Sequence, residues 1–186
     1  VGHGVGGGVA QVLATRLSRE RVAALVLIDT ICYEHSFAPD WPLPDMQKNQ
    51  DPDAPKHTKL EDMIQNLRAT LPNAVHNTRQ FDNDDVLNDY VSPWNSELGK
   101  EVLFQHIRLL IPSYSNSVAS DLKVLRKPSL IIWGELDQQM PLKLAQRLHR
   151  DMPESRLVII PEAGHLVLFD APGAVASALA DFVGRL

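Results

Sequence analysis

The sequence predicts an α/β fold with a mostly parallel sheet and helices on both of its faces. Short apolar runs end in polar or turn-forming residues at 22–29 (VAALVLID), 129–133 (SLIIW) and 156–160 (RLVII). The first two runs are typical of buried parallel strands, and the third reads as the last strand. Segments with helical apolar spacing separate the runs, and this alternation of strand and helix is the pattern of α/β proteins.

Composition and charge exclude several classes of protein. The 186 residues suffice for one domain, and the net charge is −5 with 44% hydrophobic residues. There is no basic stripe, so we expect no nucleic-acid partner. No apolar run approaches the ~18 residues of a membrane span, so we expect no membrane partner. The single cysteine, Cys32, excludes an internal disulfide and suits a reducing compartment. We therefore expect a cytoplasmic protein.

The chain opens with a glycine-rich stretch, VGHGVGGG (1–8), which predicts a sharp turn from a strand into a helix. Gly2 and Gly6 lack a Cβ and would let the two backbones approach closely. We expect the helix over about 7–17, with an inward face formed by Val9, Val12, Leu13 and Leu17. Since Val1 reads as the end of a strand, we expect a preceding N-terminal half of the same fold, in the same or a separate polypeptide.

The middle of the chain has no convincing buried strand between residue 31 and about residue 126. Prolines at 39, 42, 44, 52 and 55 predict extended or turn structure, with an exposed loop over 51–56. Helices are expected over 60–71, 84–90, 97–110 and 118–125. The sequence thus predicts core α/β structure at 1–30 and 127–186 and a helical cap insertion at 31–126.

The last third returns to the α/β pattern. The strand at 129–133 leads into a loop over 134–141, and a helix is expected over 142–150. The strand at 156–160 leads into a loop that ends at His165. A terminal helix over 172–186 follows, with Val175, Leu179, Phe182 and Val183 facing inward.

Three positions just after strand ends can carry chemistry: Gly4, Asp137 and His165. Functional groups in open α/β sheets collect beyond the carboxyl ends of the strands, so we expect the three to meet. A neutral His165 can take a proton from a hydroxyl or from water, and Asp137 can fix the tautomer of the imidazole. The backbone N–H of Val5 can stabilise an oxyanion.

The motifs around these positions resemble those of the α/β-hydrolase fold superfamily, in particular its capped hydrolases. GHGVGG (2–7) is similar to the family's G-H-nucleophile-x-G-G elbow, WGELDQQMP (133–141) to its acid loop, and AGH (163–165) to its histidine loop. The resemblance implies a cofactor-free hydrolase with a nucleophile-His-Asp triad. Its small-molecule substrate would be a small or medium apolar ester, lactone or related compound.

Gly4 departs from the family pattern, because the family places Ser, Asp or occasionally Cys there. Without a side chain, no acyl- or alkyl-enzyme can form at this residue. Three explanations remain open: an engineered inactivation, a natural loss in a ligand-binding homologue, or a lyase-type enzyme in which His165 itself acts as the base. A nucleotide-binding loop, G-x-G-x-x-G at Gly2, Gly4 and Gly7 with an acid at Asp29, is a weaker alternative.

For the remaining polar and aromatic residues we expect structural roles or contacts with the substrate. We expect His3 and Asp29 to be structural. Trp41, Trp94 and Tyr114 are the candidates for substrate contact from the cap, with Phe81, Tyr90, Phe104 and His106 as further ones; core packing is the alternative for each of them. No His/Cys/Asp cluster has metal-ligand spacing, so no metal is expected.

Overall fold

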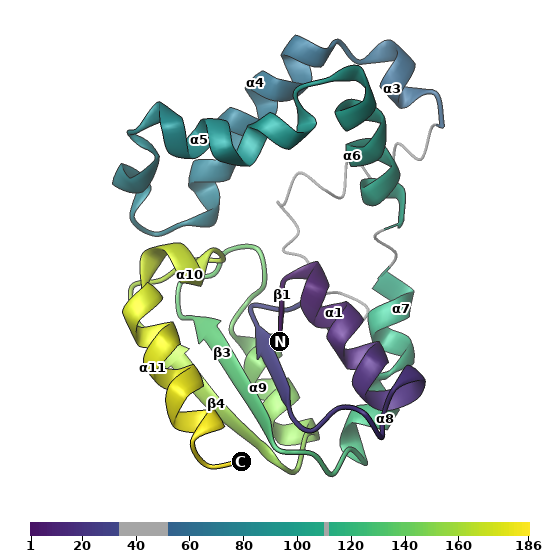
Figure 1. Cartoon of the computed structure of the whole chain (residues 1–186), viewed down its shortest axis with the longest axis vertical. Coiled ribbons are helices and arrows are strands. Elements are labelled where there is room, and N and C mark those ends of the chain that lie inside the picture. The colour runs from purple at the N-terminus through teal and green to yellow at the C-terminus, as the bar shows by residue number, and fades with distance from the viewer. Residues whose placement is uncertain (34–51, 110–111) are drawn as a thin grey trace.

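The computed structural model describes residues 1–33, 52–109 and 112–186. Trp41 and the prolines at 39, 42 and 44 lie outside the described residues, so the expectations for them stay predictions. The described part contains a parallel sheet with helices on both of its faces (Figure 1), which confirms the predicted α/β class.

The sheet has four strands in the order β1-β2-β3-β4, and every neighbouring pair is parallel. The strands are β1 (Gly2–His3), β2 (Leu25–Ile28), β3 (Ser129–Gly134) and β4 (Ser155–Ile160). Because the order in space equals the order in the chain, each crossover moves one strand along the sheet. The carboxyl ends of β1, β3 and β4, which lead into the three predicted site positions, therefore meet at one edge.

The alternation of side chains along β2 and β3 builds two cores. Leu25 and Leu27 of β2, with Ile131 and Trp133 of β3, pack under α1 (Val5–Val12), α8 (Ala119–Lys123) and α9 (Lys143–Asp151). The opposite face of the same strands packs against α11 (Pro172–Val183). A strand buried on both faces is apolar at nearly every position, which is why these two runs were recognisable in the sequence.

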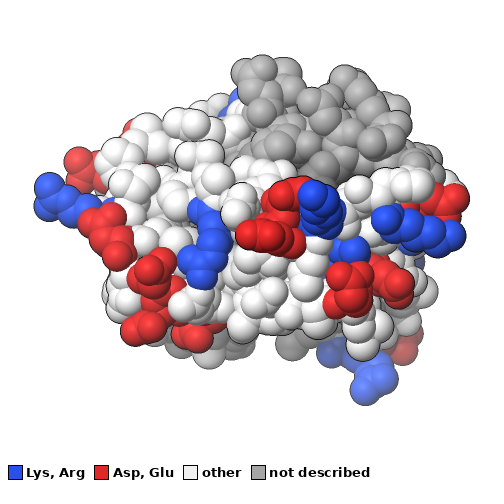
Figure 2. Space-filling view, turned by 90° about the horizontal axis from the view of Figure 1, so that it is seen from above, with Lys and Arg blue, Asp and Glu red and all other residues white. Residues whose placement is uncertain are grey.

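A layer of helices connects β2 to β3 above the carboxyl edge of the sheet (Figure 1). Its elements are α3 (Ala54–His57), α4 (Leu60–Thr70), η2 (Leu71–Ala74), η3 (Thr78–Phe81), α5 (Asp84–Val91), η4 (Ser92–Trp94) and α6 (Glu97–Leu109). We call residues 52–109 the helical region. Figure 2 looks at the molecule from this side and shows acidic and basic side chains interspersed over the described part of the surface.

The predicted inward face of the first helix is wrong. Gly7, Gly8, Gln11 and Ala14 are the buried residues of α1 and of the π-helical turn η1 (Leu13–Leu17) that continues it. Val9 and Leu17 are instead 56% and 71% exposed. The reason is close packing: a Cβ on Gly7 would lie 1.9 Å from Thr30 Oγ1, so only a glycine lets the helix approach the sheet this closely.

Three short α-helices in the described part of the chain were not predicted. Residues 54–57 form α3 with Pro55 buried, in a stretch expected to be an exposed loop. The helices α7 (Pro112–Ser117) and α10 (Val167–Asp170) are also new. Each is only one or two turns long, too short for apolar periodicity to reveal it. Within the described ranges, no helix is long and apolar enough to cross a membrane.

Candidate active site

Gly4 forms the turn between β1 and α1, with φ 53° and ψ −120°. Its carbonyl oxygen accepts hydrogen bonds from the backbone N–H of Ile31 and of Gly7, at 3.1 and 3.2 Å. Gly2 makes the tight turn possible, because a Cβ there would lie 2.3 Å from the Gly6 carbonyl oxygen. A Cβ on Gly6 would meet nothing within 4 Å, so the close approach requires Gly2 and Gly7 but not Gly6.

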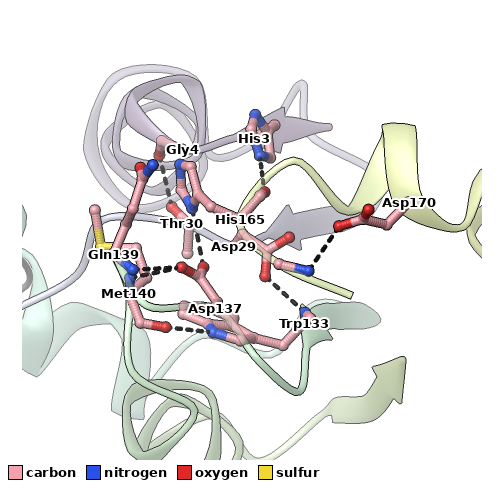
Figure 3. Close-up of polar contacts among 12 residues, drawn as sticks. His3, Gly4, Asp29, Thr30, Trp133, Asp137, Gln139, Met140, His165 and Asp170 are labelled. Carbon is pink, nitrogen blue, oxygen red and sulfur yellow. Dashed lines mark hydrogen bonds and ion pairs between the residues drawn. The ribbon is translucent and has the colours of Figure 1, made fainter. Parts of the chain in front are cut away.

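Asp137 lies in the loop over 134–141, which we call the acid loop. Its Oδ1 accepts the backbone N–H groups of Gln139 and Met140 at 2.8 and 2.9 Å. The indole Nε1 of Trp133 donates to the Met140 carbonyl oxygen at 2.8 Å and closes the loop from below. These bonds fix the carboxylate and leave its Oδ2 free to point at His165 (Figure 3).

His165 lies in the loop over 161–166, which we call the histidine loop, between Asp137 and Gly4. Its Nδ1 lies 2.9 Å from Asp137 Oδ2. An ionised carboxylate only accepts hydrogen bonds, so Nδ1 carries the proton, and in the neutral imidazole Nε2 is left as the acceptor. An ideal Cβ built on Gly4 would lie 3.6 Å from this Nε2. The imidazole therefore has a carboxylate on one side and the Gly4 turn on the other.

His3 supports the histidine loop from β1. Its Nε2 donates to the His165 carbonyl oxygen at 2.9 Å, and the two rings are 5.0 Å apart. Burial lowers the pKa of His3 below its ordinary value, which favours the neutral ring. The side chain thus bonds to backbone beside the imidazole and does not face the Gly4 turn.

Asp29 is completely buried at the end of β2, one strand away from Asp137. Its Oδ1 accepts the Gly134 N–H at 2.8 Å, which fixes the start of the acid loop, and its Oδ2 has no partner among the described residues. Burial, followed by the negative charge of Asp137, raises the pKa of Asp29 to about 9. Asp29 is therefore a neutral carboxylic acid at pH 7.

Of the other predicted site residues, Val5 adjoins Gly4 and the rest lie in α7 and the helical region. Val5 is the first residue of α1, so its N–H has no acceptor within the helix. Tyr114 is 60% exposed on α7 and lines a cavity of about 400 Å³ along the outer side of α1. Trp94 is half-buried and packs edge-on against His106, 5.9 Å away, within the helical region. Phe81 is buried in a small apolar cluster there.

Sequence reasoning missed Asp170. Its carboxylate accepts backbone N–H groups from Gly164 in the histidine loop and from His76 and Asn77 in the helical region. The only signal was an acidic residue five positions after His165, directly before the Ala-Pro that opens α11. Among the described residues, no group of His, Cys, Asp or Glu could hold a metal ion.

Comparison with known proteins identifies the family. The family model described as alpha/beta hydrolase fold matches residues 1–172. The uncharacterized hydrolase YugF of Bacillus subtilis is 30% identical over 117 residues, which are 63% of this chain and 41% of YugF. The chain belongs to the α/β-hydrolase fold family, as its motifs predicted.

Solved structures agree with this fold. The crystal structure of an alpha/beta hydrolase fold protein from Burkholderia ambifaria has a TM-score of 0.84 at 25% identity; the match covers 96% of this chain and 63% of that one. A meta-cleavage product hydrolase from Pseudomonas fluorescens has a TM-score of 0.74 at 20% identity, over 99% of this chain and 63% of that one. The present chain thus spans less than two thirds of each of these relatives.

Proposed function

We propose that this chain carries the catalytic residues of a cofactor-free hydrolase that cleaves a small or medium apolar ester, lactone or related carbonyl compound. In the parent reaction, the residue at position 4 would attack the carbonyl carbon. His165 would take the proton of the attacking group and return it to the leaving group, and Asp137 would hold His165 in the correct tautomer. The Val5 N–H would contribute to an oxyanion hole.

One observation carries this proposal: His165 is hydrogen-bonded to Asp137 and directs its other nitrogen at the Gly4 turn. A hydroxyl one bond beyond a Cβ at position 4 could come within the ~2.6–3.2 Å that joins a nucleophile to its base. The helical region above the carboxyl edge would act as a cap that shields the site from water. Membership in a hydrolase family supports the same class of reaction.

Gly4 makes the chain, as it stands, a poor catalyst by this route, because glycine cannot form a covalent intermediate. The backbone at Gly4 also has a positive φ, which L side chains rarely adopt. A side chain held there stores on the order of 1–3 kcal/mol of strain. Glycine at position 4 thus removes the nucleophile and relieves that strain at the same time.

The test is to introduce a nucleophile. We expect Gly4→Ser to raise kcat/KM for short p-nitrophenyl esters by orders of magnitude and to lower the free energy of unfolding by about 1–3 kcal/mol. Gly4→Asp, tested on esters and haloalkanes, distinguishes the two ancestral nucleophiles. The matched control is Gly6→Ala, two residues along α1, which should leave both hydrolytic activities unchanged. If neither Ser nor Asp produces turnover, the chain is not an inactivated hydrolase.

Gly4 itself favours a second candidate, in which the protein binds a ligand without turnover or uses His165 alone as a lyase-type base. A lyase of this kind would be active with Gly4 in place and would lose that activity in His165→Ala. A binding protein would hold the same ligand with similar affinity before and after Gly4→Ser.

A further inference from the structure

The segment that carries His165 is in direct backbone contact with the helical region. The Leu166 N–H donates to the Ala74 carbonyl oxygen at 2.8 Å. On the other side of His165, a Cβ on Gly164 would lie 2.9 Å from the same oxygen. Both neighbours of His165 thus lie directly against the backbone at the end of η2.

Apolar packing joins the same two segments. Leu166 and Phe169 pack against the buried cluster of Val75, Phe81 and Leu87. The rings of Phe169 and Phe81 stack with their centroids 5.9 Å apart. Because α10 directly follows the histidine loop, this cluster attaches the residues that follow His165 to the helical region.

Asp170 completes the connection through three charge-assisted hydrogen bonds. Its Oδ2 accepts from Gly164 N and His76 N, both at 2.8 Å, and its Oδ1 accepts from Asn77 N at 3.0 Å. Bonds of this kind are about twice as strong as neutral ones. Figure 3 shows the Asp170 carboxylate hydrogen-bonded to the backbone beside His165, so it contacts the chain that carries the imidazole.

We propose that Asp170 is a positioning residue, whose carboxylate fastens residues 76–77 of the helical region to the histidine loop and so holds His165 in register with Asp137. At residues 76–77 the helical region cannot shift without moving the imidazole of His165. The position of the helical region is therefore coupled to the geometry of His165. The effect on catalysis rests on the proposed function; the effect on the position of His165 does not.

Asp170→Asn tests the three hydrogen bonds of Asp170 with a nearly isosteric side chain. An amide has one acceptor oxygen, so in either orientation its NH2 faces at least one backbone N–H that Asp170 now satisfies. We expect amide hydrogen exchange at Gly164, His76 or Asn77 to accelerate about tenfold or more. We also expect the NMR signal of the His165 Nδ1–H to broaden as its bond to Asp137 loosens. Asp181→Asn, the same change at an exposed aspartate of α11, is the control and should alter neither.

Activity provides a separate readout. In the Gly4→Ser background, Asp170→Asn should lower kcat about 10–100-fold with KM within about twofold, because a misplaced base slows the chemical step. If Asp170→Asn does not fold, Asp170→Ser, whose shorter side chain cannot reach the three N–H groups and places no NH2 against them, should give the same changes. Unchanged exchange and an unchanged His165 signal in a folded variant would overturn the proposal. An inactive Gly4→Ser protein would count against the proposed function alone, because exchange and NMR do not require turnover.

Discussion

Asp29 makes the stability of this protein depend on pH in a direction that can be worked out from its surroundings. The folded protein holds a proton on this buried carboxyl up to about pH 9, whereas the unfolded chain releases it near 3.8. Between these values the folded state binds more protons, so a rise in pH favours unfolding. The stabilisation is complete below 3.8 and is lost as the pH rises towards 9.

The expected size follows from about 1.4 kcal/mol per pH unit for one proton. Over the three units from pH 5 to pH 8, Asp29 alone should lower the free energy of unfolding by up to about 4 kcal/mol. Asp29→Asn removes the titration but keeps an oxygen that can accept the Gly134 N–H. The variant should therefore gain stability relative to the unaltered protein as the pH rises.

The assay is urea denaturation of both proteins at pH 5 and pH 8, followed by tryptophan fluorescence, since Trp133 lies in the buried core. Asp181→Asn is the control. The pKa of Asp181 is lowered by its hydrogen bonds to Arg156 and Arg185, so it is ionised in both states over this range and should add no pH dependence. Parallel profiles for Asp29→Asn and the unaltered protein would refute the reasoning and would mean that Asp29 is ionised in the folded state.

Two further predictions use pairs of glycines. Gly7→Ala should destabilise the protein by about 1–3 kcal/mol, because the new Cβ would overlap Thr30, whereas Gly6→Ala in the same helix should be neutral or up to about 1 kcal/mol stabilising. Urea midpoints compare the pair, and equal losses would contradict the packing of α1 described above. Gly134→Ala should destabilise to a similar degree and displace the histidine loop, whose backbone oxygens would lie 2.3 and 2.6 Å from the Cβ. Gly173→Ala, at the start of α11 where a Cβ meets nothing within 4 Å, is the control and should cause no loss of stability. An unchanged His165 Nδ1–H signal in Gly134→Ala would show that the histidine loop has not moved and would contradict this prediction.

The fold could be predicted from the sequence because the two central strands, β2 and β3, are buried on both faces. A strand such as β3 is then apolar at nearly every position, and SLIIW shows that pattern after its first residue, Ser129. The inward face of α1 could not be predicted in the same way. There, closeness to the sheet decided the packing, so Gly7 and Ala14 are buried while the larger Val9 and Leu17 are left outside.

Part of the candidate site could be predicted from the sequence and part could not. Gly4, Asp137 and His165 each follow a strand, so their convergence could be expected from the rule on carboxyl ends. Asp170, by contrast, accepts hydrogen bonds from backbone N–H groups 93 and 94 residues away in sequence. Backbone donors leave no signature in the residue types that supply them, so only the three-dimensional arrangement reveals this contact.

The most direct test of the central claim is covalent labelling at position 4. The Gly4→Ser protein should react stoichiometrically with a fluorophosphonate, and mass spectrometry should place the adduct on the introduced serine, because His165 and Asp137 would activate the new hydroxyl. Adding His165→Ala should abolish the labelling. A folded Gly4→Ser protein whose introduced serine stays unlabelled, or reacts equally well without His165, would contradict the account.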